Sequence, residues 1–432
     1  MLLTCVNLFC LLRTAIVSEF TATDLRCYCA KPIWRPSSRA DQFCRFHSKI
    51  DDFASAPAAP SSAYSLLQSS MSPTVQPEIN GGKRRIFLVG APYVDHLIFI
   101  SAFPAEDAKL RASKPVQIRI GGNAINAALV LSPLPTTALH ILTSLPARNA
   151  CTEISAVLHA AGIVLDALYH PNIHLPPTSY CLCNEETGSR TIVSENHVPE
   201  LSAQDILHLL AHYPHSTSFH ANQKPDWVHF EGRNEMNVIA AIKYLAEQNN
   251  TAIHRVRPYI ISVELEKPAR VMLNEAALYA DVVFYSQEWA RANGFTSGAD
   301  FLTSRVGHVN PNGLLFCTWG KEGAYGYCCA SNTLVHATPP KLEQVTDTVG
   351  AGDAFIAGII NALNSFAHYP KMCPSASDYK INGEENIWTG LDQDGLTRVV
   401  SYGCQVAAEK VRIGNADKVF DTVTMNPWQL PQ

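Results

Sequence analysis

The feature that most constrains the fold is a regular alternation, from residue 85 onward, of short apolar runs with longer segments of helical periodicity. The expected strands are Ile86 to Gly90, Trp227 to Phe230, Ile260 to Val263, Val282 to Tyr285 and Leu314 to Cys317. Runs that are apolar throughout indicate strands buried on both faces, which is typical of a parallel sheet covered by helices. The sequence therefore predicts an α/β fold with a mainly parallel, doubly wound sheet.

Apolar stripes at helical spacing lie between these runs and predict the helices that would cover the sheet. The expected helices are Ala124 to Leu131, Thr152 to Ala161, Ala203 to Ala211, Val238 to Gln248, Ala354 to Leu363 and Leu396 to Val411. We therefore expect helices on both faces of the sheet.

Two segments depart from the alternation. Ser179 to Cys183 and Ser189 to Val193 are β-rich runs on either side of a turn-forming stretch, 184–188, which indicates a hairpin in a small separate sheet. Residues 368–394 are polar and without periodicity, and we expect a long surface loop there.

The first 82 residues do not share the pattern of the rest, because they hold an Ala, Pro and Ser-rich run from Ala54 to Pro73. We interpret 1–82 as a disordered or wrongly assigned leader, with Met71 as an alternative start and mitochondrial targeting as a further possibility. The apolar start lacks a positive n-region and is interrupted by Arg13, unlike a secretory signal. The globular domain is expected to span 83–425.

Composition narrows the classes of partner. The chain has 432 residues, 47% of them hydrophobic, and a formal charge of -5 with both signs dispersed. No basic stripe marks a nucleic-acid surface, and no run outside the leader approaches the ~20 apolar residues that cross a membrane. Thirteen cysteines at irregular spacing indicate reduced thiols. We expect a cytoplasmic protein with a small-molecule partner.

The strongest motif is DTVGAGD, Asp347 to Asp353, which runs into an apolar helix. Gly350 and Gly352 allow consecutive N–H groups to converge on one point, where the helix dipole adds positive charge, so an anion hole is predicted. Asp353, at the start of the helix, could serve as a base beside a phosphoryl group. The alternative is an ordinary helix-capping aspartate.

A second motif, GGNAINAA from Gly121 to Ala128, also opens a helix. It places Asn123 and Asn126 on one helical face, where amides suit hydroxyls that both donate and accept hydrogen bonds. Helix capping is an equally weighted interpretation. Asp95, five residues beyond Gly90, is expected at the carboxyl edge of the sheet, where open α/β sheets bind ligands.

These motifs, in this order, resemble the ribokinase-like (pfkB) carbohydrate kinases. Other segments are similar to the ketohexokinase branch of that family: WVHFEGRN (227–234), SVELEKP (262–268), GSRTIV (188–193) and GCQVA (403–407). The resemblance covers about residues 84 to 420. It implies an enzyme that transfers the γ-phosphate of ATP to a sugar hydroxymethyl group, with a ketohexose such as fructose favoured.

The resemblance also assigns roles to single residues. Asp353 would accept the proton of the attacking hydroxyl, and Gly350, Ala351 and Gly352 would form the anion hole. The residues expected to hold the sugar are Asp95, Gly122, Asn123 and Asn126.

For the nucleotide, the resemblance points to Arg190 at the phosphates, to the turn of Trp319, Gly320 and Gly323, and to Cys404 beside the adenine. Arg190 could also be an exposed hairpin residue, and Cys404 a buried core thiol. Glu264 would lie near Mg²⁺, which needs few protein carboxylates. Lid strands are expected within about 97–120 and 178–196, and the lid could pair with its twin in a homodimer.

Three positions depart from the resemblance and leave the substrate open. Gln287 replaces a lysine typical of the ketohexokinase branch, Ile356 follows the general sugar-kinase pattern, and Tyr93 belongs to an unusual Ala-Pro-Tyr segment. Ribose or adenosine kinases remain alternatives, as does a non-catalytic sugar or nucleotide sensor. A nicotinamide dehydrogenase is excluded, because no Gly-x-Gly-x-x-Gly follows the first strand.

Overall fold

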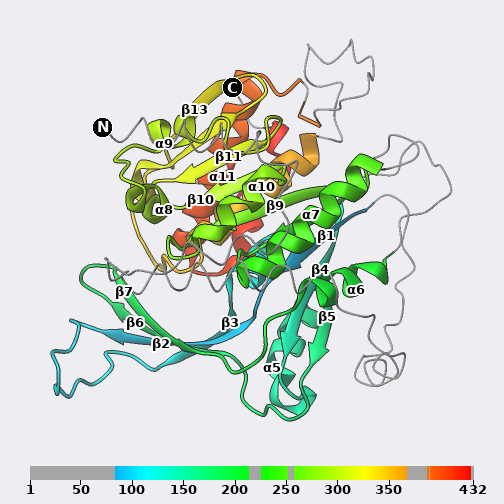
Figure 1. The fold of residues 1–432 in the computed structure, drawn as a ribbon. Helices are drawn as coiled ribbons and strands as arrows, with labels where there is room; N and C mark the ends of the chain where they lie inside the picture. Colours follow the sequence, from blue (N-terminus) through cyan, green and yellow to red (C-terminus); the bar gives the residue numbers. More distant parts are fainter. Residues whose placement is uncertain (1–82, 214–224, 252–256, 367–386, 389, 430–432) are drawn as a thin grey trace, which may run out of the picture. The chain divides into compact units, whose positions relative to one another are not determined.

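The computed structural model describes residues 83–213, 225–251, 257–366, 387–388 and 390–429 (Figure 1). The expected leader, with Met71 and the Ala54 to Pro73 run, lies outside these residues. None of the described helices combines the length and hydrophobicity that a bilayer crossing requires.

The main sheet in the described residues is mostly parallel, as the alternation predicts. Its strands, in spatial order, are β13 (Thr333–Ala337), β12 (Ala324–Cys328), β11 (Leu314–Thr318), β10 (Val282–Tyr285), β9 (Tyr259–Leu265), β8 (Asp226–Phe230), β1 (Arg84–Val89), β4 (Thr137–Leu145) and β5 (Val164–Tyr169). Only the β11–β12 and β12–β13 pairs are antiparallel. The prediction of an α/β fold with a mainly parallel, doubly wound sheet is confirmed, although β4, β5, β12 and β13 were not among the expected strands.

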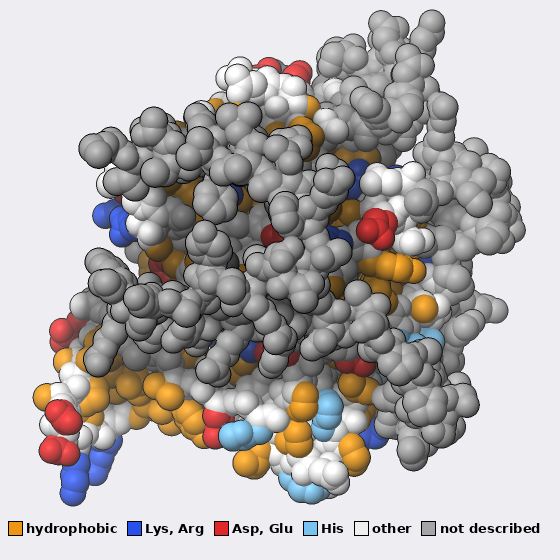
Figure 2. Space-filling model, in the orientation of Figure 1, with side chains coloured by type: hydrophobic (Ala, Val, Ile, Leu, Met, Phe, Trp, Pro, Cys, Tyr) orange, Lys and Arg blue, Asp and Glu red, His pale blue; other side chains and the backbone are white. Residues whose placement is uncertain are grey.

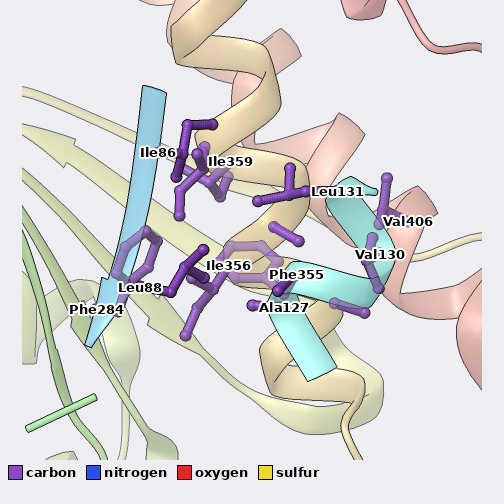
Figure 3. Packing of buried hydrophobic residues seen from close by; sticks show 14 of the residues in the cluster. Ile86, Leu88, Ala127, Val130, Leu131, Phe284, Phe355, Ile356, Ile359 and Val406 are labelled. Atoms are coloured by element: carbon purple, nitrogen blue, oxygen red, sulfur yellow. The ribbon is translucent and has the colours of Figure 1, made fainter. Parts of the chain in front are cut away.

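Helices pack on both faces because the central strands carry apolar side chains on both. On one face, Ile86 and Leu88 of β1 join a cluster with the helices α4 (Asn123–Leu131), α5 (Thr152–Ala160), α10 (Ala351–Phe366) and α11 (Gln393–Ile413) (Figure 3). On the other, Phe87 and Val89 meet α6 (Ala203–Ala211), α7 (Glu235–Thr251), α8 (Gln287–Ala292) and α9 (Gly298–Ser304).

Short 3₁₀ helices complete the described elements. They are η3 (Arg148–Ala150), η4 (Val271–Asn274), η5 (Ala276–Leu278), η6 (Gly320–Glu322), η8 (Ala416–Asp421) and η9 (Pro427–Gln429).

The second, smaller sheet has the order β3 (Gln117–Gly121), β2 (Tyr93–Ile100), β6 (Thr178–Asn184) and β7 (Arg190–Glu195), and we call it the lid sheet. It holds the expected hairpin as β6 and β7, and it extends to the lower left in Figure 1. Asp95 lies within β2, and therefore on the lid sheet rather than at the edge of the main sheet. The reason is that the chain leaves β1 and enters β2 after only Gly90, Ala91 and Pro92.

Strand register gives the two faces of the lid sheet different chemistry. Asp95 pairs with Arg119 on β3 and with Ser179 on β6, and Ser179 pairs with Ser194 on β7, which makes one polar row across four strands. One residue further, His96 aligns with the set Ile118, Tyr180 and Val193, which makes an apolar row on the opposite face.

The expected surface loop at 368–394 is described only at its end. Trp388 and Leu391 are buried there, and α11 already begins at Gln393. Trp388 and Leu391 therefore belong to the core, whereas residues 392–394 are exposed. Residues 368–386 lie outside the described residues.

Candidate active site

A cavity of about 600 Å³ is lined by residues of both sheets. On the side of the main sheet it is bounded by residues at the carboxyl ends of parallel strands, including Glu231 after β8, Glu266 after β9 and Ser286 after β10. On the side of the lid sheet it is lined by Asp95 and Ser179 of the polar row. The site thus occupies the usual ligand-binding edge of an open α/β sheet.

Asp353 lies in the first turn of α10, lines the cavity and is only 7% exposed. Asn126 on α4 donates a hydrogen bond from Nδ2 to Asp353 Oδ2 at 2.7 Å. Burial raises the pKa of Asp353 to about 7; the Asn126 hydrogen bond opposes this shift, and the charge of Glu266 adds to it. A carboxyl poised near neutrality is the property that a general base needs.

The loop before α10 has the geometry of a tight entry turn. Gly350 has a φ of 79°, a left-handed conformation that favours glycine, and its N–H lies ahead of the helix. Gly350 and Gly352 line the cavity. Ala351 donates its N–H to the carbonyl of Thr348 at 3.3 Å, so this turn is closed by its own backbone.

A buried cation, Lys410 on α11, holds this loop from behind. Its Nζ lies 2.9 Å from Asp347 Oδ2 and 3.3 Å from the Asp347 carbonyl, and it also donates to the carbonyl of Val349. Burial lowers the pKa of Lys410, and the carboxylate of Asp347 counteracts that shift. The lysine therefore fixes the segment that leads into Gly350.

Carboxylates gather on the side of the main sheet. Asn123 Nδ2 lies 3.1 Å from Glu264 Oε1 and 3.2 Å from Glu266 Oε2, so one amide bridges both acids. Burial, followed by the charges of Glu266, Asp353 and Glu231, raises the pKa of Glu264 well above its ordinary value. Clustered buried oxygens of this kind suit a hard cation such as Mg²⁺, which commonly takes one or two carboxylates plus phosphate oxygens and water.

The lid side of the cavity carries Asp95, which is 6% exposed. Burial raises its pKa, while Arg119 and a hydrogen bond from Ser179 oppose the shift. Gly122 comes close to the chain that leads to Asp95: a Cβ there would lie 2.2 Å from the carbonyl oxygen of Ala91, and its φ is 105°. A side chain at position 122 would therefore push the two segments apart.

Tyr93, one of the unusual positions, joins the two sheets. Its hydroxyl accepts a hydrogen bond from Arg233 Nη2 at 2.8 Å, and Arg233 Nη1 donates to Glu231 Oε1 at 3.2 Å. The other oxygen of Glu231 accepts the N–H of Ala91 at 3.2 Å. The segment between β1 and β2 is thus anchored to the end of β8.

Of the residues expected at the nucleotide, Arg190 and Gly320 line the cavity. Arg190, on β7, donates to Thr348 Oγ1 at 3.0 Å and so reaches the loop before α10. Trp319 and Gly323 do not line the cavity; Trp319 donates its N–H to the carbonyl of Gly323 at 2.7 Å, which closes the turn around Gly320. With the Gln287 amide turned to satisfy its neighbours, the Gln287 oxygen accepts from Trp319 Nε1 at 3.0 Å.

Cys404 is buried on α11 and donates its thiol to the carbonyl of Ala337, and burial raises its pKa to about 12. In the described structure it is a core thiol and does not line the cavity. Of the other expected site residues, all but Ala351, Trp319 and Gly323 line the cavity.

Comparison with known proteins now identifies the family. Residues 89–379 match the pfkB family of carbohydrate kinases. The chain belongs to this family. It is 27% identical to ketohexokinase of Mus musculus over 345 residues, which cover 78% of this chain and 99% of that protein.

Solved structures show the same fold at low identity. A ribokinase from Giardia lamblia superimposes with a TM-score of 0.62 at 14% identity, covering 78% of this chain and 96% of the other. A fructokinase from Vibrio cholerae, determined with fructose, ADP and potassium ion bound, gives a TM-score of 0.52 at 17% identity, covering 78% and 95%.

Several residues of this carbohydrate kinase that face or support the cavity were not expected from the sequence. They are Arg119, Glu231, Arg233, Glu266 and Lys410. Glu231 carries a signal that could have indicated it, because it directly follows the predicted strand Trp227 to Phe230. Glu266 lies three residues beyond the predicted strand Ile260 to Val263 and directly follows β9 only because the observed strand extends to Leu265. Lys410 and Arg119 carry none, because their partners lie 63 and 228 residues away in the chain.

We expect Lys410→Met to lower the kinase kcat at least tenfold and to destabilise the protein by about 3 to 5 kcal/mol, because it leaves Asp347 and two carbonyls without their buried cation. Urea unfolding and steady-state kinetics measure both effects. Arg412→Met is the matched control, since Arg412 pairs with Glu409 on the exposed side of the same helix. Equal losses in both variants would contradict this role of Lys410.

Proposed function

We propose that this carbohydrate kinase transfers the γ-phosphate of ATP to a hydroxymethyl oxygen of a sugar, with a ketohexose such as fructose favoured. The observation that carries the proposal is Asp353: a buried carboxylate that lines the cavity, receives a hydrogen bond from Asn126 and lies directly after a glycine-rich turn at a helix start.

In this mechanism Asp353 accepts the proton of the attacking sugar hydroxyl. The raised pKa of Asp353 lies near neutral pH. At that pH a substantial fraction of the carboxyl groups is ionised, and the carboxylate still accepts a proton readily. Asn126 keeps the carboxylate in one orientation, because its amide donates to one oxygen and leaves the other to face the cavity.

Negative charge on the transferred phosphoryl group is met by the start of α10. Backbone N–H groups at Gly350 and Gly352 and the dipole of the 16-residue helix favour an anion there. Ala351, also expected in the anion hole, donates its N–H to Thr348 and so holds the turn closed. Arg190, already within hydrogen-bond reach of Thr348, supplies a guanidinium for phosphate oxygens of ATP. We also assign the turn formed by Trp319, Gly320 and Gly323 to the nucleotide, because Gly320 lines the cavity.

Glu264 and Glu266 are the residues that would hold Mg²⁺, together with phosphate oxygens and water. When bound, Mg²⁺ neutralises charge on the phosphates. The surroundings of Glu264 support this, because a cation there would offset both causes of its raised pKa: burial first, and then the negative charges of Glu266, Asp353 and Glu231.

The sugar is assigned to the lid side of the cavity, to Asp95, Gly122, Asn123 and Asn126. Fructose is favoured because the chain is similar to a ketohexokinase over nearly all of that protein. Tyr93, Gln287 and Ile356, the three departures, all line the cavity, so another sugar such as ribose, or a nucleoside such as adenosine, is the alternative. A sensor that only binds is disfavoured, because binding alone gives no reason to bury Asp353 beside a phosphate site.

The outer face of the lid sheet supports a homodimer. Ile118 and Val193 are 59% and 62% exposed, and they lie in one row with Tyr180. Figure 2 shows hydrophobic side chains gathered along this arm of the molecule. A second copy of the chain would shield these side chains from water.

The free thiols among the described cysteines fit the expected cytoplasmic location.

A substrate panel tests the proposal. The purified full chain, given ATP and Mg²⁺, should form ADP only when a sugar is added, and fructose should give the highest kcat/KM among fructose, ribose, adenosine and ketodeoxy acids. Preference for ribose or adenosine would select the alternative kinase. ATP consumption that no acceptor stimulates would favour the sensor.

Asp353→Asn should lower kcat by about 10² to 10⁴-fold while ATP binding changes little, because the carboxylate acts as base and the anion site is backbone. Asp300→Asn is the matched control: Asp300 also lies third in its helix, α9, but on the exposed surface. Calorimetric titration with ATP and steady-state assays measure the two quantities. Retained turnover in Asp353→Asn would remove this residue from the mechanism.

The rate should depend on pH through Asp353. Burial raises the pKa of Asp353 to about 7, so the base is increasingly protonated below that pH, and kcat/KM for the sugar should fall about tenfold per unit on the acid side. Glu266→Gln removes a negative charge that raises the pKa of Asp353, so the acid limb of the pH profile should move to lower pH. Glu185→Gln, at the lid tip, should leave it in place. An acid limb that Glu266→Gln does not move would contradict the assignment.

A further inference from the structure

Arg119, on lid strand β3, contacts the loop that precedes the anion site of the large domain. Its Nη1 donates to Asp347 Oδ2 at 2.6 Å, across 228 residues of sequence. The other oxygen of Asp347, Oδ1, accepts a hydrogen bond of 2.8 Å from the N–H of Val349, the residue directly before Gly350. The Asp347 carboxylate therefore joins the lid sheet to the phosphate-binding loop, beside the hydrogen bond that Arg190 of β7 donates to Thr348.

The same guanidinium also lies beside Asp95, which lines the cavity. Strand register places Arg119 directly opposite Asp95, and its Nε lies 3.9 Å from Asp95 Oδ2. That distance is beyond a hydrogen bond, and Nε is buried without a hydrogen-bond partner among the described residues. A buried donor in this state is costly, and a small movement of β2 toward β3 would satisfy it.

Folding alone does not account for Arg119. Asp347 already has a buried cationic partner in Lys410, which also holds the neighbouring carbonyls. Arg119 is a second cation on the same carboxylate, with a side chain 27% exposed. What it adds is a connection between two carboxylates: Asp95, which lines the cavity, and Asp347, in the loop that leads to Gly350.

We propose that Arg119 is a positioning residue that couples sugar binding to nucleotide binding. The inference rests on the proposed function, in which Asp95 holds the sugar and the loop after Asp347 holds the phosphates. A sugar bound to Asp95 brings that carboxylate to Arg119 Nε, and the guanidinium then fixes Asp347 and the N–H groups that follow it. Each ligand therefore tightens the binding of the other, since coupling of two binding equilibria is reciprocal.

The experiment is a calorimetric titration of the full chain with the β,γ-imido analogue of ATP, with Mg²⁺, in the absence and presence of saturating fructose, or of whichever panel sugar supports turnover. The ratio of the two dissociation constants should be about tenfold in the unmodified protein, within the roughly 5- to 150-fold range of coupled sites. In Arg119→Gln it should fall to less than about twofold, and the sugar KM should become independent of nucleotide concentration.

Lys114→Gln is the matched control. Lys114 pairs with Glu185 within the lid at 2.6 Å, so this substitution removes the same charge as Arg119→Gln but breaks no contact with the large domain. It should keep the full ratio. Arg119→Lys keeps the attraction to Asp347, which protects folding, but one ammonium cannot span both carboxylates, so its ratio should also fall.

A ratio near one in the unmodified protein, or a full ratio in either Arg119 variant, overturns the coupling; so does an equal loss in Lys114→Gln. These outcomes differ from failure of the proposed function. Absence of turnover with every sugar overturns the kinase assignment itself, whereas turnover with an unchanged ratio overturns only the role of Arg119.

Discussion

The hydrogen bond between Asn126 and Asp353 is the contact on which the site depends. It joins α4 to α10, two helices that pack side by side on one face of the main sheet and share its apolar core. Each helix begins at a glycine-rich turn, so docking the helices brings the two turns to the same cavity. The apolar stripes of the helices therefore do more than stabilise the fold, because their packing sets the distance between Asp353, the proposed base, and the residues assigned to the sugar.

Burial gives this site its electrostatic character. Asp353, Glu264 and Asp95 all have raised pKa values, and in each case removal from water is the largest cause. Cations oppose the accumulated negative charge at the margins of the cavity: Lys410 behind the loop, and Arg119 at the lid. The cavity therefore favours ligands that bring positive charge with them or donate hydrogen bonds, which is consistent with the proposed metal-bound nucleotide and sugar.

The sequence was sufficient for the fold class and for the residues grouped around Asp353, because these depend on local patterns: apolar runs, glycine turns and helix starts. It was insufficient where position depends on distant partners. Asp95 was expected at the edge of the main sheet, since nothing in residues 90–95 shows that the chain enters a second sheet so soon. Lys410 lies on an amphipathic helix like any other lysine, and only the folded structure shows that it is buried against Asp347.

The alternating rows of the lid sheet limit how the gene for this protein can change. Because neighbouring residues of β2 face opposite sides, deletion or insertion of one residue within the strand would exchange Asp95 with His96. The polar row would then face outward and the apolar row would line the cavity, so a single codon would damage both surfaces at once. Length variation should instead be confined to the connection between β2 and β3, residues 101–116, where added residues leave both rows in register.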